Sequence, residues 1–324
     1  MQDKGTVCAI VVTYNRKNLL IDCLDSLREQ TRPLDAIYII DNASSDGTET
    51  ILKENKYIAD LPPRSLLDPW EKESYINNLL DKTSIRIHYV RMPENTGGAG
   101  GFHEGLKRGF EKRYDWFWLM DDDVILDRNA LSSFFDVQIE PNEFGFLCSN
   151  VLGKNNLPMN VPGIDFRLNE NKYIDWGRFM DRGLIKVRAC TFVSVFLNWK
   201  IVENIGLPLK DFFIWEDDHE YTLRISDKFP SYQVAKSIVY HLREIQKYLN
   251  INLEKDKSRI KLYFYKFRNS LYIIRKYEKK RKVAYIFYRR LILVLKSIFT
   301  RHGLFKTYII LKGNFSGLFF EPKS

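Results

Sequence analysis

Acidic residues in this sequence stand where they could bind a metal ion. Asp121, Asp122 and Asp123 directly follow the apolar run 116–120. Three adjacent carboxylates repel one another, so a bound cation is the simplest reason for their position. Side chains alternate in direction along an extended chain, which would place Asp121 and Asp123 on one side. Their oxygens are typical ligands for Mn²⁺ or Mg²⁺.

A second acidic run supplies candidates for a general base. Residues 216–220 read Glu-Asp-Asp-His-Glu and follow the apolar run 212–215. A carboxylate held beside Trp215 and other acids could have a raised pKa and accept a proton from a hydroxyl group. Acids are also typical of a helix N-terminus, and both interpretations can hold together. His241 ends a further apolar run; a lone histidine there is more often structural, but it is also a candidate third metal ligand.

Two other stretches have the chemistry of a nucleotide site. Asp41 follows the apolar run 37–40, and we expect it to accept the imide N–H of a pyrimidine, whereas Asp46 is expected to cap the next helix. Arg16 follows the run 6–12 and could face phosphate. The loop 93–102 has four glycines within five residues, which lets backbone approach a phosphate or sugar. It lacks the Lys-Ser/Thr of a P-loop and the spaced third glycine of a dinucleotide fingerprint.

An open α/β sheet is the element that would bring these residues together. Helical spacing at 19–27 lies between two short apolar runs, which predicts a parallel βαβ unit. Ligands of such sheets bind at the carboxyl ends of the strands, where the polar residues described above lie. The segment 53–83 is polar and proline-containing, and is predicted to be an insertion. Strands are predicted at 6–12, 37–40, 85–90, 116–120, 144–149 and 189–198, and a further helix at 101–112.

Charge divides the 324-residue chain into two parts. Residues 243–324 carry a formal charge of +16, and residues 1–242 carry −7. We therefore predict a catalytic domain over 1–242 and a basic, aromatic-rich helical region over 243–324. The basic region has the composition of helices that lie on an anionic membrane surface, except that 263–274 is expected to pack on the catalytic domain. The four cysteines are far apart and are expected to be buried, as in a reducing cytosol.

The order of these motifs resembles the inverting, family-two glycosyltransferases of the GT-A fold. VVTYNR, DNASSDGT, a DxD-type triad, an acidic base motif and a histidine occur in that order between residues 6 and 241. NTGGAGGF, WFWLMDDDV and WEDDHEY together look most like the bacterial galactofuranosyltransferases. The resemblance implies an α/β fold with a mostly parallel central sheet.

The resemblance also assigns roles by position. Asp218 matches the base in an Asp-x-Glu frame, with a one-residue ambiguity between Asp217 and Asp218. Asp123 and His241 would bind the metal, and Asp121 would contact the metal or the ribose. Positions matching the nucleotide and donor site are Thr13, Arg16, Asp41, Asn95, Gly98, Asp121 and Asp122. Positions matching the acceptor site are Trp215, Asp217 and Glu220.

The implied activity is metal-dependent transfer of galactofuranose from UDP-galactofuranose to a lipid-linked or oligosaccharide acceptor, in synthesis of a cell-surface polysaccharide such as O-antigen or capsule. The expected location is the inner face of the cell membrane, with an oligomer as one option. One alternative is a rhamnosyltransferase that uses dTDP-rhamnose. Nucleotidyl transfer would need a basic residue beside the glycine loop, which is missing. A basic membrane- or RNA-binding protein would leave the acidic motifs unexplained, so no nucleic-acid partner is expected.

Overall fold

Strands and helices alternate through the first half of the chain, as predicted. The structure is a computed structural model and describes residues 5–140, 143–243 and 249–323. The first elements are β1 (Val7–Thr13), α1 (Lys17–Arg28), β2 (Ala36–Asp41), α2 (Thr48–Glu54), β3 (Trp70–Asn77), β4 (Ser84–Arg91), α3 (Gly97–Glu111), β5 (Trp116–Asp121), β6 (Val124–Leu126) and α4 (Ala130–Phe135). The next are β7 (Leu147–Gly153), β8 (Gly163–Ile164), η1 (Met180–Arg182), β9 (Leu184–Ala189), β10 (Val195–Asn198), α5 (Trp199–Ile205), η2 (Lys210–Phe212), α6 (Asp217–Ser226) and β11 (Ser231–His241).

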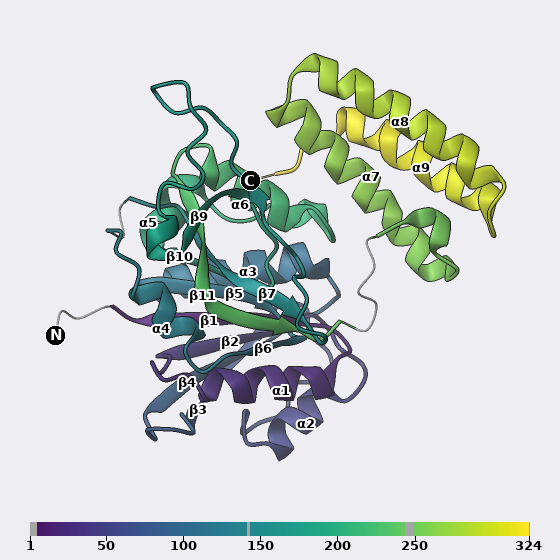
Figure 1. Ribbon diagram of the computed structural model, residues 1–324. Helices are drawn as coiled ribbons and strands as arrows, with labels where there is room; N and C mark the ends of the chain where they lie inside the picture. The colour runs from purple at the N-terminus through teal and green to yellow at the C-terminus, as the bar shows by residue number, and fades with distance from the viewer. Residues whose placement is uncertain (1–4, 141–142, 244–248, 324) are drawn as a thin grey trace.

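One mixed sheet forms the centre of the molecule (Figure 1). Its strand order is β3-β4-β2-β1-β5-β10-β7-β11-β9-β8, with β6 paired to β11. Strands β4, β2, β1 and β5 are mutually parallel, whereas β3, β10 and β9 run antiparallel to their neighbours. The carboxyl ends of β1, β2, β4 and β5 therefore meet at one edge, as expected for a ligand crevice.

Helices cover both faces of the sheet. Alternate residues of β1 point to opposite sides, so that Val11 joins one apolar cluster and Ile10 joins another. Helices α1, α2 and α4 pack in the first cluster, and α3, α5 and α6 pack in the second. The four cysteines are buried and free, as predicted.

The C-terminal region forms a separate group of helices beside the sheet (Figure 1). It contains η3 (Ile251–Leu253), α7 (Lys257–Tyr277), α8 (Lys280–Ile298) and α9 (Gly303–Phe319). Tyr272 and Ile273 of α7 share an apolar cluster with Leu209 and Phe212, which confirms the predicted packing of 263–274 on the catalytic domain. Within the described residues, no helix is both long enough and apolar enough to cross a membrane.

Two local predictions differ from the structure. The predicted strand 189–198 is wrong, because it joins the last residue of β9 to all of β10 across a non-strand stretch at 190–194. Apolar residues continue through that stretch, so the pattern hides the break. The segment 53–83 includes β3, which pairs antiparallel with β4 at the edge of the sheet. An edge strand pairs on one side only and is more exposed to solvent. None of the residues of β3 is fully buried, so its sequence has no strong alternation of apolar and polar residues.

Candidate active site

Asp121, Asp123 and His241 lie together at the carboxyl ends of β5 and β11. One potential ligand atom from each residue lies within 4.8 Å of the others. His241 Nδ1 is 2.8 Å from Asn160 Oδ1, and its Nε2 is 3.0 Å from Asp123 Oδ1. If Nδ1–H donates to Asn160, the Nε2 lone pair faces a carboxylate oxygen, and a proton or metal ion must lie between them. The donor set fits a divalent cation.

The pKa values of the three acids reflect the crowding of negative charge. Burial and the neighbouring Asp123 raise the pKa of Asp121 to about 6. Burial likewise raises the pKa of Asp122 to about 7. Burial is also the largest single effect on Asp123, but the hydrogen bond with His241 and the charges of His241 and Arg16 together lower the pKa of that carboxyl.

Asp122 is bound by Thr13, the last residue of β1, and by Arg16, which follows that strand. Thr13 Oγ1 donates to Asp122 Oδ2 at 2.6 Å. The half-exposed Arg16 guanidinium contacts Asp122 Oδ1 at 3.1 Å and Asp123 Oδ2 at 2.7 Å. Arg16 therefore balances part of the acidic charge and links the end of β1 to the triad. Contacts of Thr13, Arg16 and Asp122 with a nucleotide stay predictions.

A buried asparagine fixes the glycine-rich loop. Asn42 Oδ1 accepts from the Thr96 backbone N–H at 2.9 Å, and Asn42 Nδ2 donates to Gly97 O at 2.8 Å and to Asn95 Oδ1 at 3.1 Å. A Cβ on Gly97 would lie 1.9 Å from Phe213 O, whereas one on Gly98 would meet nothing within 4 Å. Gly98 is therefore the position of this pair where a ligand could approach the backbone. Asn42 lies within the DNASSDGT motif but was given no role from the sequence.

Asp41 is more enclosed than a base-contacting residue was expected to be. It is fully buried, and its Oδ2 accepts from Tyr89 at 2.8 Å and from Arg91 at 2.5 Å. Its Oδ1 accepts from the Ser44 backbone N–H at 2.8 Å. As placed, Asp41 has no exposed surface to offer a pyrimidine, so its contact with a base stays a prediction. Asp46 accepts from the backbone N–H groups of Lys17 and Thr48, the first residues of α1 and α2, which confirms it as a cap.

The acidic run forms the first turn of α6 and places its members differently. Asp217 is buried, and burial together with the neighbouring Asp218 charge raises its pKa well above the ordinary value. Asp218 is half-buried, and its pKa is raised to about 6, mainly by burial. The charge of Asp218 also contributes to the raised pKa of Asp121, so the first turn of α6 interacts electrostatically with the triad of Asp121, Asp123 and His241.

Glu220 was predicted to contact the acceptor, but the structure places it in the interior. It is fully buried, and its carboxylate binds Arg224 at 3.0 Å and the Tyr277 hydroxyl at 2.6 Å. With no exposed surface, Glu220 links α6 to α7, and its contact with an acceptor stays a prediction.

Backbone strain is concentrated immediately before α6. Phe213, Trp215 and Glu216 all have φ between 62° and 71°, a region that residues with side chains rarely adopt. Ile214 N–H donates to Phe212 O at 2.8 Å, which closes a γ-turn around Phe213. Such residues cost about 1–3 kcal/mol each and persist only where surrounding contacts fix them. Trp215, predicted to shape the acceptor site, is part of this strained stretch.

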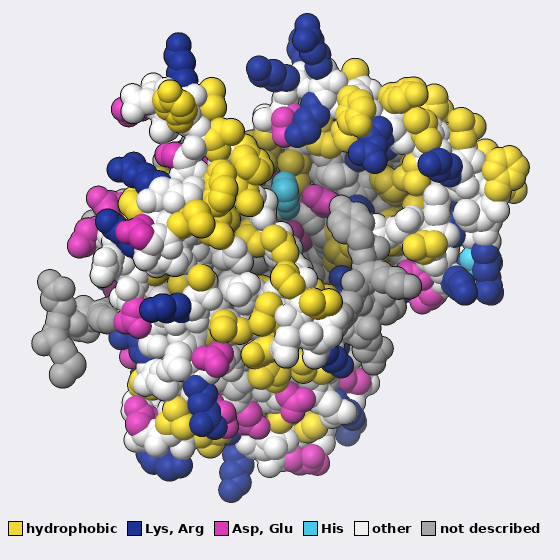
Figure 2. Space-filling model, viewed as in Figure 1, with side chains coloured by type: hydrophobic (Ala, Val, Ile, Leu, Met, Phe, Trp, Pro, Cys, Tyr) yellow, Lys and Arg dark blue, Asp and Glu magenta, His cyan; other side chains and the backbone are white. Residues whose placement is uncertain are grey.

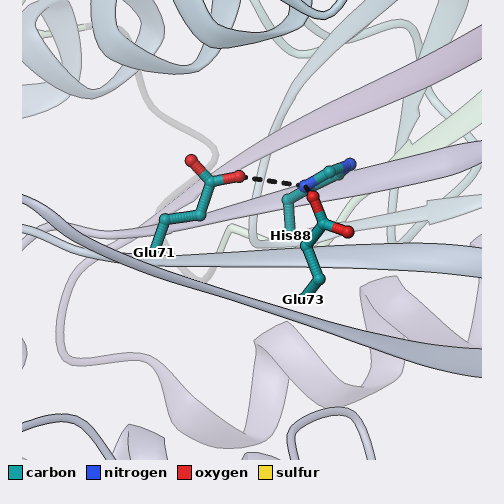
Figure 3. Close-up of side chains that lie close together, drawn as sticks. All are labelled: Glu71, Glu73 and His88. Carbon is teal, nitrogen blue, oxygen red and sulfur yellow. Dashed lines mark hydrogen bonds and ion pairs between the residues drawn. The ribbon is translucent and has the colours of Figure 1, made fainter.

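A second cluster with metal-ligand chemistry lies on the hairpin of β3 and β4. Glu71 and Glu73 approach His88 Nδ1 at 3.0 and 3.5 Å, as Figure 3 shows for Glu71. Arg108 pairs with Glu71, and Lys112 pairs with Glu73 at 2.8 Å. Because these cations already balance the carboxylates, the hairpin cluster is a charge network that ties β3 to α3.

The sequence that forms this site matches a known protein family. Residues 8–64 and 72–200 match the model of glycosyl transferase family 2. The chain belongs to this family. The match covers β1, the glycine-rich loop and the acidic triad, and ends before α6.

Curated members of the family are similar over part of their length. The chain is 31% identical over 123 residues to the galactofuranosyltransferase GlfT1 of Mycolicibacterium smegmatis, which covers 38% of this chain and 32% of that protein. It is 24% identical over 157 residues to TuaG of Bacillus subtilis, a putative teichuronic acid biosynthesis glycosyltransferase, which covers 48% of this chain and 51% of TuaG. The chain thus spans about a third to half of these relatives.

Solved glycosyltransferases share the fold. GalNAc-T7, solved with UDP, GalNAc and Mn²⁺, superposes with a TM-score of 0.54 at 12% identity, over 81% of this chain and 50% of that one. A mannosyltransferase from Pyrobaculum calidifontis, solved with GDP-Man and Mn²⁺, gives 0.51 at 14% identity, over 96% and 74%. The chain is therefore a family 2 glycosyltransferase with the GT-A fold.

Proposed function

We propose that this glycosyltransferase moves galactofuranose from UDP-galactofuranose to a hydroxyl of a lipid-linked or polysaccharide acceptor, with inversion at the anomeric carbon. One observation carries the mechanistic part. The half-buried Asp218 has a pKa of about 6. Its charge also acts on Asp121, which forms a possible metal site with Asp123 and His241. The partial likeness to GlfT1 supports the choice of sugar.

The reaction follows from these residues. Asp218 accepts the proton of the acceptor hydroxyl, whose oxygen attacks the anomeric carbon on the face opposite the departing nucleotide diphosphate. Asp121, Asp123 and His241 would hold Mn²⁺ or Mg²⁺, which would neutralise charge on the leaving diphosphate. Arg16 and Gly98 are proposed to lie near the donor, together with Thr13 and Asn95.

A peripheral position on the inner face of the cell membrane is the second part of the proposal. Residues 280–319, which form α8 and α9, contain nine Lys and Arg and no Asp or Glu. Hydrophobic side chains gather over these helices among the cations (Figure 2). An apolar surface with one sign of charge suits an anionic lipid leaflet, where lipid-linked acceptors occur.

A donor comparison tests the function. UDP-galactofuranose, UDP-galactopyranose and dTDP-rhamnose are offered separately with a synthetic lipid-linked acceptor, and the intact mass of the product is measured. We expect a hexose addition from UDP-galactofuranose only. Transfer from dTDP-rhamnose alone would show that the proposed donor is wrong, while the chain would still be a glycosyltransferase. Asp218→Asn serves as the inactive control.

A further inference from the structure

The strained stretch before α6 is held in place by α7, from outside the sheet. We call residues 213–216 the base-side turn, because Asp217 and Asp218 follow it directly. Three of its residues have a left-handed backbone. A stretch of this kind needs neighbours that fix it, and the structure shows where they come from.

Asn269 of α7 makes the central contact. Its side chain is fully buried, and its Nδ2 lies 2.9 Å from Phe212 O, 3.2 Å from Ile214 O and 2.9 Å from Trp215 O. Its Oδ1 accepts from Arg268 Nε at 2.9 Å, which fixes the orientation of the amide. The two hydrogens of one side-chain amide are thus shared among three carbonyls of the stretch 212–215.

Other side chains of α7 contact the base-side turn along its length. Lys266 Nζ pairs with Glu216 Oε1 at 3.0 Å. The rings of Tyr265 and Phe213 stack with centroids 4.7 Å apart, and those of Tyr263 and Trp215 meet edge to face at 5.1 Å. From the opposite side, the Ala99 backbone N–H of α3 donates to Phe213 O at 3.1 Å. The turn is therefore clamped between α7 and the glycine-rich N-terminus of α3.

We propose that Asn269 is a positioning residue of the transfer reaction, acting through the base-side turn on Asp218. The proposal rests on the role of Asp218 as base. Without a donor at position 269, the carbonyls of Ile214 and Trp215 would lose the Asn269 N–H groups as partners, and the turn would relax toward right-handed backbone. The first turn of α6 starts at the end of this stretch, so its relaxation would move the Asp218 carboxylate. The C-terminal region is then part of the catalytic machinery as well as a docking element.

A matched pair of variants separates positioning from simple support of the fold. Asn269→Leu removes the donor and keeps the branched shape of the side chain. Asn314→Leu is the control, because Asn314 is also a buried asparagine of the C-terminal helices but accepts from Arg290 of α8 instead of binding the carbonyls of residues 212–215. Both changes should lower the unfolding temperature by similar amounts, because each leaves polar groups without a partner.

Two measurements decide between the interpretations. In protein labelled with 5-fluorotryptophan, the Trp215 resonance is assigned by its loss in Trp215→Phe and is then compared in the two asparagine variants. With UDP-galactofuranose as the probe, kcat and the donor KM are measured for each. Asn269→Leu should shift or broaden the Trp215 resonance and lower kcat by roughly tenfold to a hundredfold, with KM changed less than about threefold. Asn314→Leu should leave both at wild-type values.

Two outcomes would overturn the proposal: an unshifted Trp215 resonance in folded Asn269→Leu, or equal kcat in the two asparagine variants. Should Asn269→Leu not fold, Lys266→Met breaks the neighbouring contact with Glu216 and must move the same resonance. If the wild-type enzyme does not use UDP-galactofuranose, the proposed donor fails, while the fluorine spectra still decide whether Asn269 holds the turn.

Discussion

Asp217 and Asp218 are neighbours in sequence but have different surroundings. Asp217 is buried, and burial together with the neighbouring Asp218 charge raises its pKa well above the ordinary value. Asp218 is half-buried with a pKa of about 6. A general base works best when its pKa lies close to the working pH. The structure therefore favours Asp218 where the sequence left two choices.

Replacing Asp218 by asparagine should separate catalysis from stability. We expect turnover to fall by roughly a hundredfold or more, with donor binding retained, because the proton acceptor is lost. Since the folded-state pKa is raised, the ionised carboxylate costs stability above pH 6. The free energy of unfolding at pH 8 should then rise by about 1 kcal/mol. If Asp217→Asn shows this pattern and Asp218→Asn does not, the base is Asp217.

The pH profile of kcat should depend on Lys266. Asp218 must be deprotonated to act, so activity should rise with pH through about 6. The positive charge of Lys266 lowers the pKa of Asp218, so Lys266→Met should move the acidic limb to higher pH. Lys261→Met is a control that keeps the same change in net charge. An unmoved limb in Lys266→Met would contradict the assignment of Asp218.

The triad predicts metal dependence that can be measured without turnover. Mn²⁺ titration followed by electron paramagnetic resonance should show a site that Asp123→Ala and His241→Ala weaken by roughly tenfold or more. Asp136→Ala changes an exposed carboxylate just after α4 and should bind as wild type does. Transfer should stop in EDTA and return with Mn²⁺ or Mg²⁺. Full activity in EDTA together with unchanged Mn²⁺ binding in Asp123→Ala would contradict the assignment of a metal site to this triad.

At the scale of elements, α3 depends on glycines for packing more than for ligand approach. A Cβ at Gly101 would lie 2.4 Å from Val12 Cγ1, and one at Gly105 would lie 2.5 Å from Ile10 Cγ2. These two positions, one helical turn apart, let α3 lie directly on β1. The close packing in turn places the N-terminus of α3 against the base-side turn.

Alanine substitutions test this division of roles. Gly105→Ala should lower the free energy of unfolding by about 1–3 kcal/mol, because the added methyl group overpacks the contact with β1. Gly98→Ala should leave stability within about 0.5 kcal/mol and instead raise the donor KM, since its Cβ would enter open space beside the crevice. Chemical denaturation and donor kinetics measure both. Equal destabilisation by the two substitutions would be inconsistent with the structure.

At the scale of the whole molecule, α8 and α9 present large apolar side chains to solvent. Phe299 is 90% exposed and Leu304 is 80% exposed. Other exposed apolar side chains of α8 and α9 are Tyr285, Phe287, Tyr288, Leu291, Leu295, Ile298, Tyr308, Leu311, Phe315 and Phe319. A second copy would bring the same cations against this face, so an anionic leaflet is the better electrostatic match than self-association.

Liposome cosedimentation should detect this docking. We expect binding to anionic vesicles that weakens in high salt, and little binding to neutral ones. The double variant Phe299→Ser with Leu304→Ser should bind several-fold more weakly. Leu67→Ser is the control, because Leu67 is equally exposed but lies outside the C-terminal region. A dimer in solution that binds no vesicles would make this face an interface between copies.

Periodicity and motif order by themselves determined the α/β core and the family. The runs that became β1, β2, β4 and β5 are apolar because both of their faces are covered, and each is followed by polar residues at the crevice. Helical spacing identified α1 and the C-terminal helices for the same local reason. These features lie within short windows of sequence, so a single chain is enough to show them.

Only the tertiary structure decided which residues that are distant in sequence contact one another at the site. Asn160 and Asn269 carry no local motif, and Asn42 has no assigned role within DNASSDGT, yet each binds a group that lies more than 50 residues away along the chain. The same holds for the burial of Asp41 and Glu220, and for the difference between Asp217 and Asp218. Burial and hydrogen bonding depend on which segments meet in space, and local patterns do not encode that meeting. The sequence therefore indicated the chemistry of the site, and the packing of α3 and α7 around the base-side turn set its geometry.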